Sequence, residues 1–455
     1  MRSFLSATAS VLALASPLAA FAQTTPPSTE TVPALADKPP QKASPKGMTV
    51  GLTGDWGGKR DQLFDDGIDF QLGFANQFVG NVAGVRKGVA DNGQALIGTN
   101  LDMDKLAGIR GGKARVLVIV RYGHDLNIDK QLGLIQNLQS NNGRGNIPRL
   151  TEAWYEQSLA GGKLSLRVGR EPTGLEFGTS TCDSQNRAFC GSPPGNLPDS
   201  YTYWLSYPSS TWMARARLNL GANNKLGYLQ TGVYQTNPDQ NADRDHGFKL
   251  GLKHGTGVLI PLEFGLTPDL WAGHPGIYKI GGWVETSQVR DIFEDDEGNP
   301  IVLSGKLGKT MRGRHGIYFE ARQQLTPSSK GVGKAGLSVF LNMFKFDDRT
   351  SKVDNYIGGG LIQTGTFASR PDDQLAIEFS RTHVNSRLAD ADRLLAQTDP
   401  LQEVRGSEYA TELDYRIAVT RGLRIIPNVQ YVVDPGGYAN HHDVLAFGMM
   451  TNVLF

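Results

Sequence analysis

The sequence predicts an all-β protein: a 16-stranded antiparallel transmembrane β-barrel of the outer membrane, preceded by a short periplasmic helix. Three observations support this fold class. The chain starts with an export signal, and after it no run of about 18 apolar residues occurs that could form a transmembrane helix. Segments of roughly eight to twelve residues alternate in hydrophobicity between turn residues. The last of these segments has one apolar face, as a strand in contact with lipid requires. Because the sequence has no candidate transmembrane helix, any membrane span must consist of strands.

The closing stretch, residues 444–455, alternates between two faces. Its odd positions form an almost wholly apolar face: Leu445, Phe447, Met449, Thr451, Val453 and Phe455. A terminal strand of a soluble sheet shows the same pattern, so this stretch alone leaves both interpretations open. In a barrel it is the closing strand, because a barrel in lipid leaves no strand edge unpaired. We then expect the barrel-assembly machinery to bind the chain through this strand, which ends at Phe455.

Residues 1–22 have the pattern of a signal peptide. Arg2 supplies the positive start, a short apolar core follows, and the Ala-Phe-Ala sequence before Gln23 predicts cleavage there.

The chain after the signal peptide divides into three parts. Residues 23–50 are rich in Pro, Thr, Ala and Lys, and they predict a disordered periplasmic leader. Residues 51–67 predict a short periplasmic helix with Trp56 on its apolar face. The transmembrane barrel then occupies residues 68–455.

The composition agrees with an exported barrel. The net charge of +1 gives no bulk attraction for nucleic acid or for an anionic membrane surface. Hydrophobic residues make up 39% of the 455 residues and the mean hydropathy is −0.31, lower than expected for a helical membrane protein. A barrel with a wet lumen needs an apolar side chain at only every second strand position. The 55 glycines fit many turns and close strand packing.

Sixteen spans can be counted, an even number that brings both chain ends to the periplasmic side. In the span 211–220, apolar side chains occupy even positions, whereas Arg215 and Arg217 occupy odd ones. Connections after even-numbered spans are mostly short, and several of the others are long, above all 170–210. Short periplasmic turns and long external loops are the usual asymmetry of such barrels.

The segment 52–60 reads Leu-Thr-Gly-Asp-Trp-Gly-Gly-Lys-Arg and contains Asp55, Trp56, Gly57, Gly58 and Arg60. It resembles the opening motif of the carbohydrate-selective porins of the OprB family. Other blocks resemble the same family: 167–170, 176–177, 228–234, 237–238, 275–283, 370–375, 427–432 and 435–437. The resemblance covers about residues 50–455 and implies a 16-stranded outer-membrane barrel that passes sugars. Two departures, a polar insert at 287–313 and a basic segment at 247–256, are expected to lie in loops.

Side chains on the strand faces opposite the lipid are the candidates for a solute path. They mix Arg, carboxylate and aromatic groups: Glu152, Trp154, Arg167, Arg215, Arg217, Tyr228, Trp283, Glu285, Glu320, Arg322 and Glu412. An aromatic ring stacks on the apolar face of a sugar, while Arg donates hydrogen bonds to its hydroxyls and carboxylates accept them. Weak binding at several such sites lets a solute both enter and leave. Alternatively, these Arg and Glu side chains pair across the wall and only hold the barrel together.

The loop 170–210 is the candidate constriction, because a loop tied by a disulfide can fold inward, keep one shape and narrow the lumen. Export makes a disulfide between its two cysteines, Cys182 and Cys190, chemically allowed. Two unpaired thiols are the alternative. The loop also contains three aromatic residues, Tyr201, Tyr203 and Trp204.

The sequence predicts a channel and not an enzyme. None of the motifs H-E-x-x-H, G-x-S-x-G or C-x-x-C occurs, and we expect the adjacent pair His441 and His442 to face solvent and not to bind a metal. No cofactor is predicted. An outer-membrane hydrolase barrel is the enzyme alternative, but the chain offers no candidate nucleophile for it.

The expected function is passive, carbohydrate-selective diffusion of monosaccharides such as glucose, and of similar small polyols, into the periplasm of a Gram-negative bacterium. A broad, weakly anion-preferring pore is the alternative, which the like charges of Arg215 and Arg217 permit. The expected partners are small sugars and outer-membrane lipid, and not nucleic acid. The oligomeric state does not follow from the sequence.

Overall fold

The computed structural model describes residues 51–455 except 142, 180–183, 191–203, 242–246, 271–273, 327–335 and 368. All described residues belong to one compact unit, Thr31–Phe455. The predicted signal peptide and leader, residues 1–22 and 23–50, lie outside the described residues, so both stay predictions.

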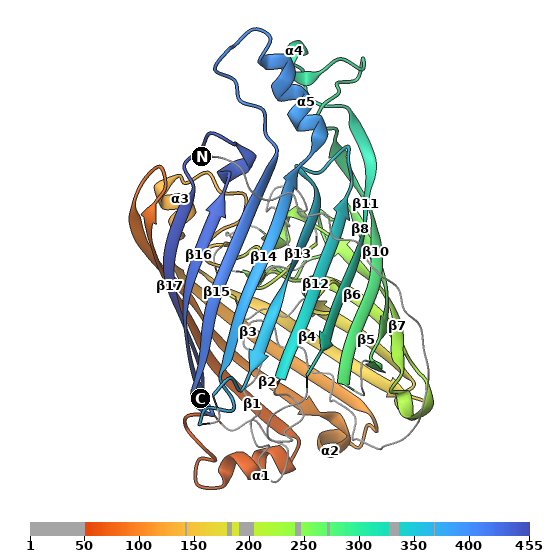
Figure 1. Cartoon of the computed structure of the whole chain (residues 1–455). Helices are drawn as coiled ribbons and strands as arrows, with labels where there is room; N and C mark the ends of the chain where they lie inside the picture. Colours follow the sequence, from red (N-terminus) through yellow and green to blue (C-terminus); the bar gives the residue numbers. More distant parts are fainter. Residues whose placement is uncertain are drawn as a thin grey trace. The chain divides into compact units, whose positions relative to one another are not determined.

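In the described part of the chain, sixteen long antiparallel strands close into a barrel (Figure 1). The strands are β1 (Ile68–Ala83), β2 (Gly88–Asp102), β3 (Gly112–Gly123), β4 (Pro148–Leu159), β5 (Leu164–Glu171), β6 (Thr211–Leu220), β7 (Gly227–Thr236), β8 (Gly257–Leu266), β10 (His274–Arg290), β11 (Thr310–Gln324), β12 (Gly336–Phe346), β13 (Val353–Thr364), β14 (Gln374–Val384), β15 (Ser407–Thr420), β16 (Leu423–Val433) and β17 (Val444–Leu454). The two-residue strand β9 (Asp269–Leu270) only extends the hairpin beside β10. The ring closes because β1 pairs with both β2 and β17. The predicted 16-stranded barrel is confirmed.

The side chains alternate between lipid and lumen along the strands, as the period of two requires. On β17, Ala446 and Met450 are buried, whereas Phe447 and Met449 are 49% and 44% exposed on the outer wall. Similar exposed apolar side chains surround the barrel, including Ile97, Val168, Ile280, Ile317 and Phe379. The apolar face of the closing strand therefore faces outward, next to β1.

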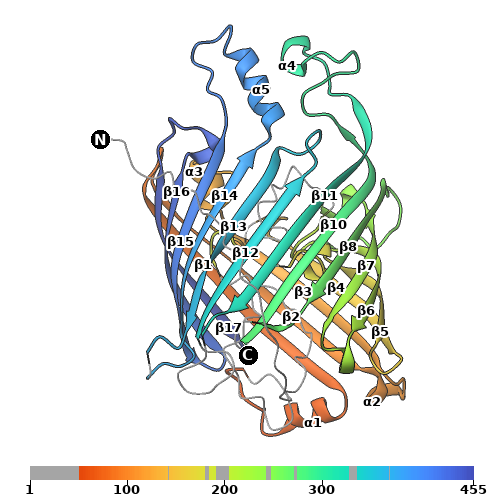
Figure 2. The same ribbon diagram turned by 45° about the vertical axis from the view of Figure 1, so that its right-hand side comes forward.

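Helices and loops gather at the two ends of the barrel. The helices are α1 (Lys59–Asp65), α2 (Met103–Ala107), α3 (Leu126–Lys130), α4 (Ile301–Ser304) and α5 (Ser386–Leu395), with 3-10 turns η1 (Thr173–Leu175), η2 (Ala222–Asn224), η3 (Pro238–Asn241) and η5 (Pro435–Gly437). The helices α1 and α2 and the C-terminus lie at one end, and α4 and α5 lie at the other (Figures 1 and 2). Among the described residues, no helix is long and apolar enough to cross a membrane.

The loops at the α5 end include the long segments 124–147, 172–210, 237–256, 291–309 and 385–406. Two strands extend further toward this end than the spans 68–80 and 94–104 that the sequence predicts: β1 reaches Ala83 and β2 begins at Gly88. The start of β2 escapes an analysis of apolar alternation because its buried side chains, Ala90 and Asn92, are small or polar.

The opening motif joins the two ends of the described chain. Trp56, Gly57 and Gly58 have φ angles of 56°, 68° and 86°, so this left-handed turn precedes the helix, which begins at Lys59. The prediction that Trp56 lies on the helix face is therefore wrong. The buried Arg60 donates to a main-chain oxygen of Phe455 at 2.9 Å and to the carbonyl of Phe70 at 3.2 Å.

Arg60 also places its guanidinium 5.1 Å from the centre of the Trp56 ring. Asp55 accepts a hydrogen bond from the Gly57 amide at 3.1 Å. These contacts tie α1 to the seam between the first and last strands, a structural position away from the centre of the lumen.

Candidate functional site: the lumen and its inward loops

Described residues of the loop 172–210 fold into the barrel and attach to the inner wall. The carboxylate of Glu412 on β15 accepts hydrogen bonds from the backbone amides of Gln185 at 2.8 Å and Asn186 at 2.7 Å. The hydroxyl of Ser184 donates to Glu378 on β14. All of these side chains are at most 3% exposed. Buried side chains whose oxygens receive such hydrogen bonds hold a loop firmly, because a buried donor that loses its acceptor costs free energy.

A second loop, 124–147, also folds inward. Glu408 on β15 accepts hydrogen bonds from the amides of Ile135 at 2.6 Å and Gln136 at 2.9 Å. The two loops also bind each other, since the Arg187 amide donates to the carbonyl of Asn137 at 2.8 Å. Sequence reasoning nominated only 170–210. The missed signal is the apolar content of this polar loop, where Leu132, Leu134 and Leu138 are all buried.

An aromatic contact anchors the far end of the loop 172–210. The ring of Trp204 lies 4.8 Å from that of Trp283 on β10 and 6.2 Å from that of Tyr318 on β11. The side chains of Trp204 and Trp283 are 1% and 3% exposed. Trp283 thus lies on the inner wall, as the alternation of its strand predicts, but Trp204 covers it. Tyr201, Tyr203 and Cys182 lie outside the described residues, and the disulfide to Cys190 stays a prediction.

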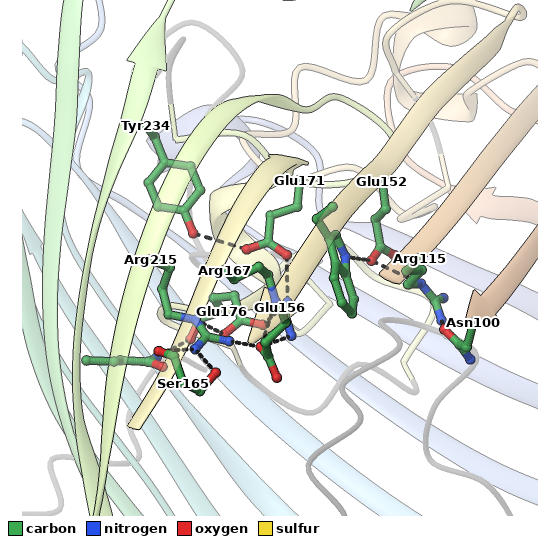
Figure 3. Close-up of polar contacts among 12 residues, drawn as sticks. Asn100, Arg115, Glu152, Glu156, Ser165, Arg167, Glu171, Glu176, Arg215 and Tyr234 are labelled. Carbon is green, nitrogen blue, oxygen red and sulfur yellow. Dashed lines mark hydrogen bonds and ion pairs between the residues drawn. The ribbon is translucent and has the colours of Figure 1, made fainter. Parts of the chain in front are cut away.

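The charged side chains of β4, β5 and β6 meet the start of this loop in one cluster (Figure 3). Arg167 is its centre: the guanidinium contacts Glu156 at 2.9 Å, Glu171 at 2.8 Å and Glu176 at 2.6 Å. Arg215 contacts Glu156 at 2.7 Å and Glu176 at 3.2 Å. Two guanidinium groups therefore share three carboxylates at the point where the loop leaves β5.

Glu176, which lies in the loop, remains a carboxylate in this cluster. Burial alone would raise the pKa of Glu176, but Arg167 and Arg215 outweigh burial and hold this pKa below its usual range. The loop is thus attached to the wall by a charge that persists at neutral pH.

A partly exposed tryptophan borders the cluster. The guanidinium of Arg167 lies 3.9 Å from the ring centre of Trp154, and the indole N–H donates to Glu152 at 2.8 Å. Glu152 is buried, and it also pairs with Arg115 at 3.0 Å and accepts from the hydroxyl of Tyr207 at 2.8 Å. The ring of Trp154 is therefore fixed by a cation on its face and a carboxylate at its edge.

Arg217 and Tyr228 lie next to this cluster. The Arg217 guanidinium lies 3.7 Å from the ring centre of Tyr228 and donates to Asn219 at 3.1 Å. The Tyr228 hydroxyl donates to the buried Glu263 at 2.7 Å. The two arginines of β6 thus differ, because Arg215 contacts two carboxylates at close range whereas Arg217 stacks on an aromatic ring.

The other predicted lumen residues are engaged with the wall or the loops. Glu320 pairs with Lys279 at 3.1 Å, and Glu285 pairs with Arg314 at 3.6 Å. Arg322 is partly exposed on β11. Sequence reasoning did not select Glu171 or Glu176 as site residues. For Glu171 a signal exists, because the period of two places it on the same face as Arg167.

The loop 124–147 contains a carboxyl group that makes its docking depend on pH. Asp125 caps α3 by accepting from the Ile128 amide at 3.2 Å, and only 2% of its surface is exposed. Burial raises the pKa of Asp125 to about 6, against a usual value of about 3.9. The folded state then binds the proton more tightly than the unfolded state does. Its contribution to stability is full below about pH 4 and is lost as the pH rises through about 6.

We therefore expect Asp125→Asn to remove this dependence. Relative to the variant, the wild-type protein should lose on the order of 3 kcal/mol of unfolding free energy between pH 4 and pH 7. Denaturant unfolding at both pH values measures the difference. The control is Asp104→Asn, which removes an exposed carboxylate of α2 at the other end of the barrel and should leave the pH profile of the wild type unchanged. If Asp125→Asn leaves the pH dependence of the unfolding free energy unaltered, then Asp125 is not its source.

The comparisons with known proteins agree with the fold. The model of the family described as "Carbohydrate-selective porin, OprB family" matches residues 86–455. The chain belongs to this family. Porin B of Pseudomonas aeruginosa is 34% identical over 423 residues, which cover 89% of this chain and 91% of that protein. The putative porin QuiX of Acinetobacter baylyi is 28% identical over 431 residues, which cover 89% and 93%.

Solved structures of Pseudomonas putida OprB are similar to this member of the OprB family. The high-pH structure matches with a TM-score of 0.85 and 31% identity, covering 90% of this chain and 99% of that chain. The low-pH structure matches with a TM-score of 0.57 and 24% identity, covering 89% and 98%. The resemblance predicted from the opening motif is confirmed, and the family makes this protein a porin of the Gram-negative outer membrane, a channel and not an enzyme.

Proposed function

We propose that this porin conducts monosaccharides such as glucose, and similar small polyols, by passive diffusion into the periplasm. The observation that supports the proposal most is the cluster of Arg167, Glu156 and Trp154 beside the inward loop. It combines an aromatic ring, fixed donors and fixed acceptors in one partly exposed site. A sugar can exchange its hydration shell for such groups in steps, because its ring face and its hydroxyls need different partners.

The same proposal includes the export of the chain, the constriction of the lumen and the assembly of the barrel. Residues 1–22 direct export, the inward loop 172–210 forms the constriction together with 124–147, and the pair Cys182 and Cys190 closes a small loop within it. The barrel-assembly machinery receives the strand that ends at Phe455. The two inward loops support this arrangement because they occupy the lumen beside the candidate solute groups.

The alternative of a broad, weakly anion-preferring pore loses part of its support. It rested on two like charges, Arg215 and Arg217, on one face of β6. Arg215 contacts the carboxylates of Glu156 and Glu176, so its charge is compensated at close range. Arg217 remains as a cation in contact with neutral groups, and any anion preference should depend on it.

Single-channel conductance of the refolded mature chain in a planar bilayer tests the function. We expect glucose to block the current saturably, whereas an uncharged non-sugar of similar size should not. A salt gradient gives the ion preference in the same experiment, and we expect a reversal potential near zero. Strong anion preference without glucose block would establish the alternative pore and refute carbohydrate selectivity.

A further inference from the structure

The outer wall of the barrel carries a groove that the solute path does not use. It lies over β12–β15, neighbouring strands at the front of Figure 1, and its volume is ≈ 500 Å³. Apolar side chains of β12, β13 and β14 line most of it, among them Leu341, Leu361 and Phe379, and Arg381 and Tyr409 complete the lining. The groove therefore combines a long apolar floor with a polar end.

The groove exists because Gly359 presents no side chain to the lipid. In the sheet register, Gly359 lies between Leu341 of β12 and Phe379 of β14. Ile357 and Leu361, 39% and 43% exposed, flank it along β13. A Cβ atom at position 359 would come within 2.7 Å of a main-chain oxygen of β12, so the close strand approach also requires glycine. The missing side chain leaves a hollow in the outer wall, surrounded by apolar side chains.

Arg381 forms the polar end. It shares a register row with Ile357 and Tyr409. Its guanidinium donates to the neutral side chains of Asn355 at 3.1 Å and Ser407 at 2.9 Å. Within the described residues no carboxylate pairs with it. A guanidinium carries five N–H donors in a fixed fork, so donors remain for an anion.

The height of Arg381 fits the boundary between headgroups and acyl chains. It is the fourth residue from the end of β14, and that strand leads directly to α5. The long loops gather at this end, which identifies it as the extracellular side. The register row nearer the loops is polar, with Asn355, His383 and Ser407, whereas the row nearer the barrel centre contains Gly359 and Phe379. An arginine costs little free energy at such a boundary, in contrast to the membrane midplane.

We propose that this groove binds one phosphorylated lipid of the outer leaflet, with an acyl chain over Gly359 and a headgroup phosphate at Arg381. The rows from Arg381 to Leu361 span about 13 Å along the strands, so a stretched alkyl segment fits the floor. The guanidinium fork suits a phosphate in bidentate geometry. A second copy of this chain suits the groove less, because a dry protein interface would bury Arg381 without a counter-charge. The proposal does not depend on which solute crosses the lumen.

Native mass spectrometry of the full-length folded porin in detergent tests the site. The probes are bisphosphorylated lipid A and its dephosphorylated form. We expect the wild type to retain the phosphorylated lipid roughly tenfold more strongly, and Arg381→Gln to remove that preference. Leu361→Trp should fill the groove and weaken retention of both lipids. Inorganic phosphate in excess should not displace the lipid, because the acyl chain contributes to binding.

The matched control is Arg312→Gln, which removes an exposed arginine of β11, a strand outside the groove, and should leave retention unchanged. Equal retention of the two lipids by the wild type overturns the proposal, and so does equal retention of the phosphorylated lipid by Arg381→Gln and Arg312→Gln. A dimer that Leu361→Trp dissociates also overturns it, since the groove would then be an interface between copies. If Leu361→Trp does not fold, the proposal is still tested by the retention of the two lipids by the wild type and by the two arginine variants.

Discussion

Replacing Arg167 with glutamine is expected to destabilise the barrel strongly and to abolish block by glucose. Arg167 contacts three carboxylates, those of Glu156, Glu171 and Glu176, at 2.6–2.9 Å. A neutral side chain leaves them near one another with Arg215 as the remaining close cation. Removing one partner of a buried ion pair typically costs about 3–5 kcal/mol, because the remaining charge is left uncompensated. Repulsion should also displace Glu176, and with it the start of the loop 172–210.

The free energy of unfolding from denaturant titration and the glucose block in a planar bilayer measure the two effects separately. The matched control is Arg217→Gln, the same change at a neighbouring arginine that stacks on Tyr228 and donates to Asn219. We expect it to cost about 1 kcal/mol, the range of a single cation–π contact. If both variants lose the same stability and keep the same block, then the cluster around Arg167 is not the centre of the site.

The fold could be predicted because each strand carries its own information. A period of two decides which side chains face lipid and which face the lumen, so Phe447 and Met449 could be placed outside from the sequence alone, and Arg167 and Arg215 inside. Turn residues and loop lengths add the polarity of the barrel. The start of β2 was missed because its inward residues, Ala90 and Asn92, are small or polar and give no clear apolar alternation.

The site could be predicted only in part, because its contacts join residues that are distant in the sequence. Glu412 was correctly assigned an inward position, but nothing near it in the chain indicates that its carboxylate binds the amides of Gln185 and Asn186. The same is true of Trp283, whose partner Trp204 belongs to a loop. Alternation assigns a side chain to the lumen. Alternation does not show whether the side chain contacts solute or contacts a loop that folds back into the lumen.

Glu408→Gln and Glu412→Gln are expected to widen the channel by releasing the inward loops. Each carboxylate accepts two backbone amides of an inward loop, with distances of 2.6–2.9 Å, and Glu408 also accepts the amide of Gly436 at 2.9 Å. A glutamine keeps one acceptor oxygen but turns an N–H₂ group toward the second amide, so one hydrogen bond is lost and a repulsive contact replaces it. A buried donor left without its acceptor costs roughly 1–3 kcal/mol. Losing about 3 kcal/mol raises the population of a released loop more than a hundredfold.

Conductance separates this role from a direct contact with solute. If the two carboxylates act by holding the loops, each variant should show a larger open-channel current for salt together with weaker glucose block, and exchange of the Gln185 and Asn186 amides with solvent should accelerate in Glu412→Gln. A residue that only binds sugar would lower the block and leave the salt current and the amide exchange unchanged. Glu297→Gln is the control, because this exposed carboxylate of the loop 291–309 pairs with Lys306 on the same loop. The two loops bind each other through Arg187 and Asn137, so the double variant should show an effect that departs from the sum of the single ones.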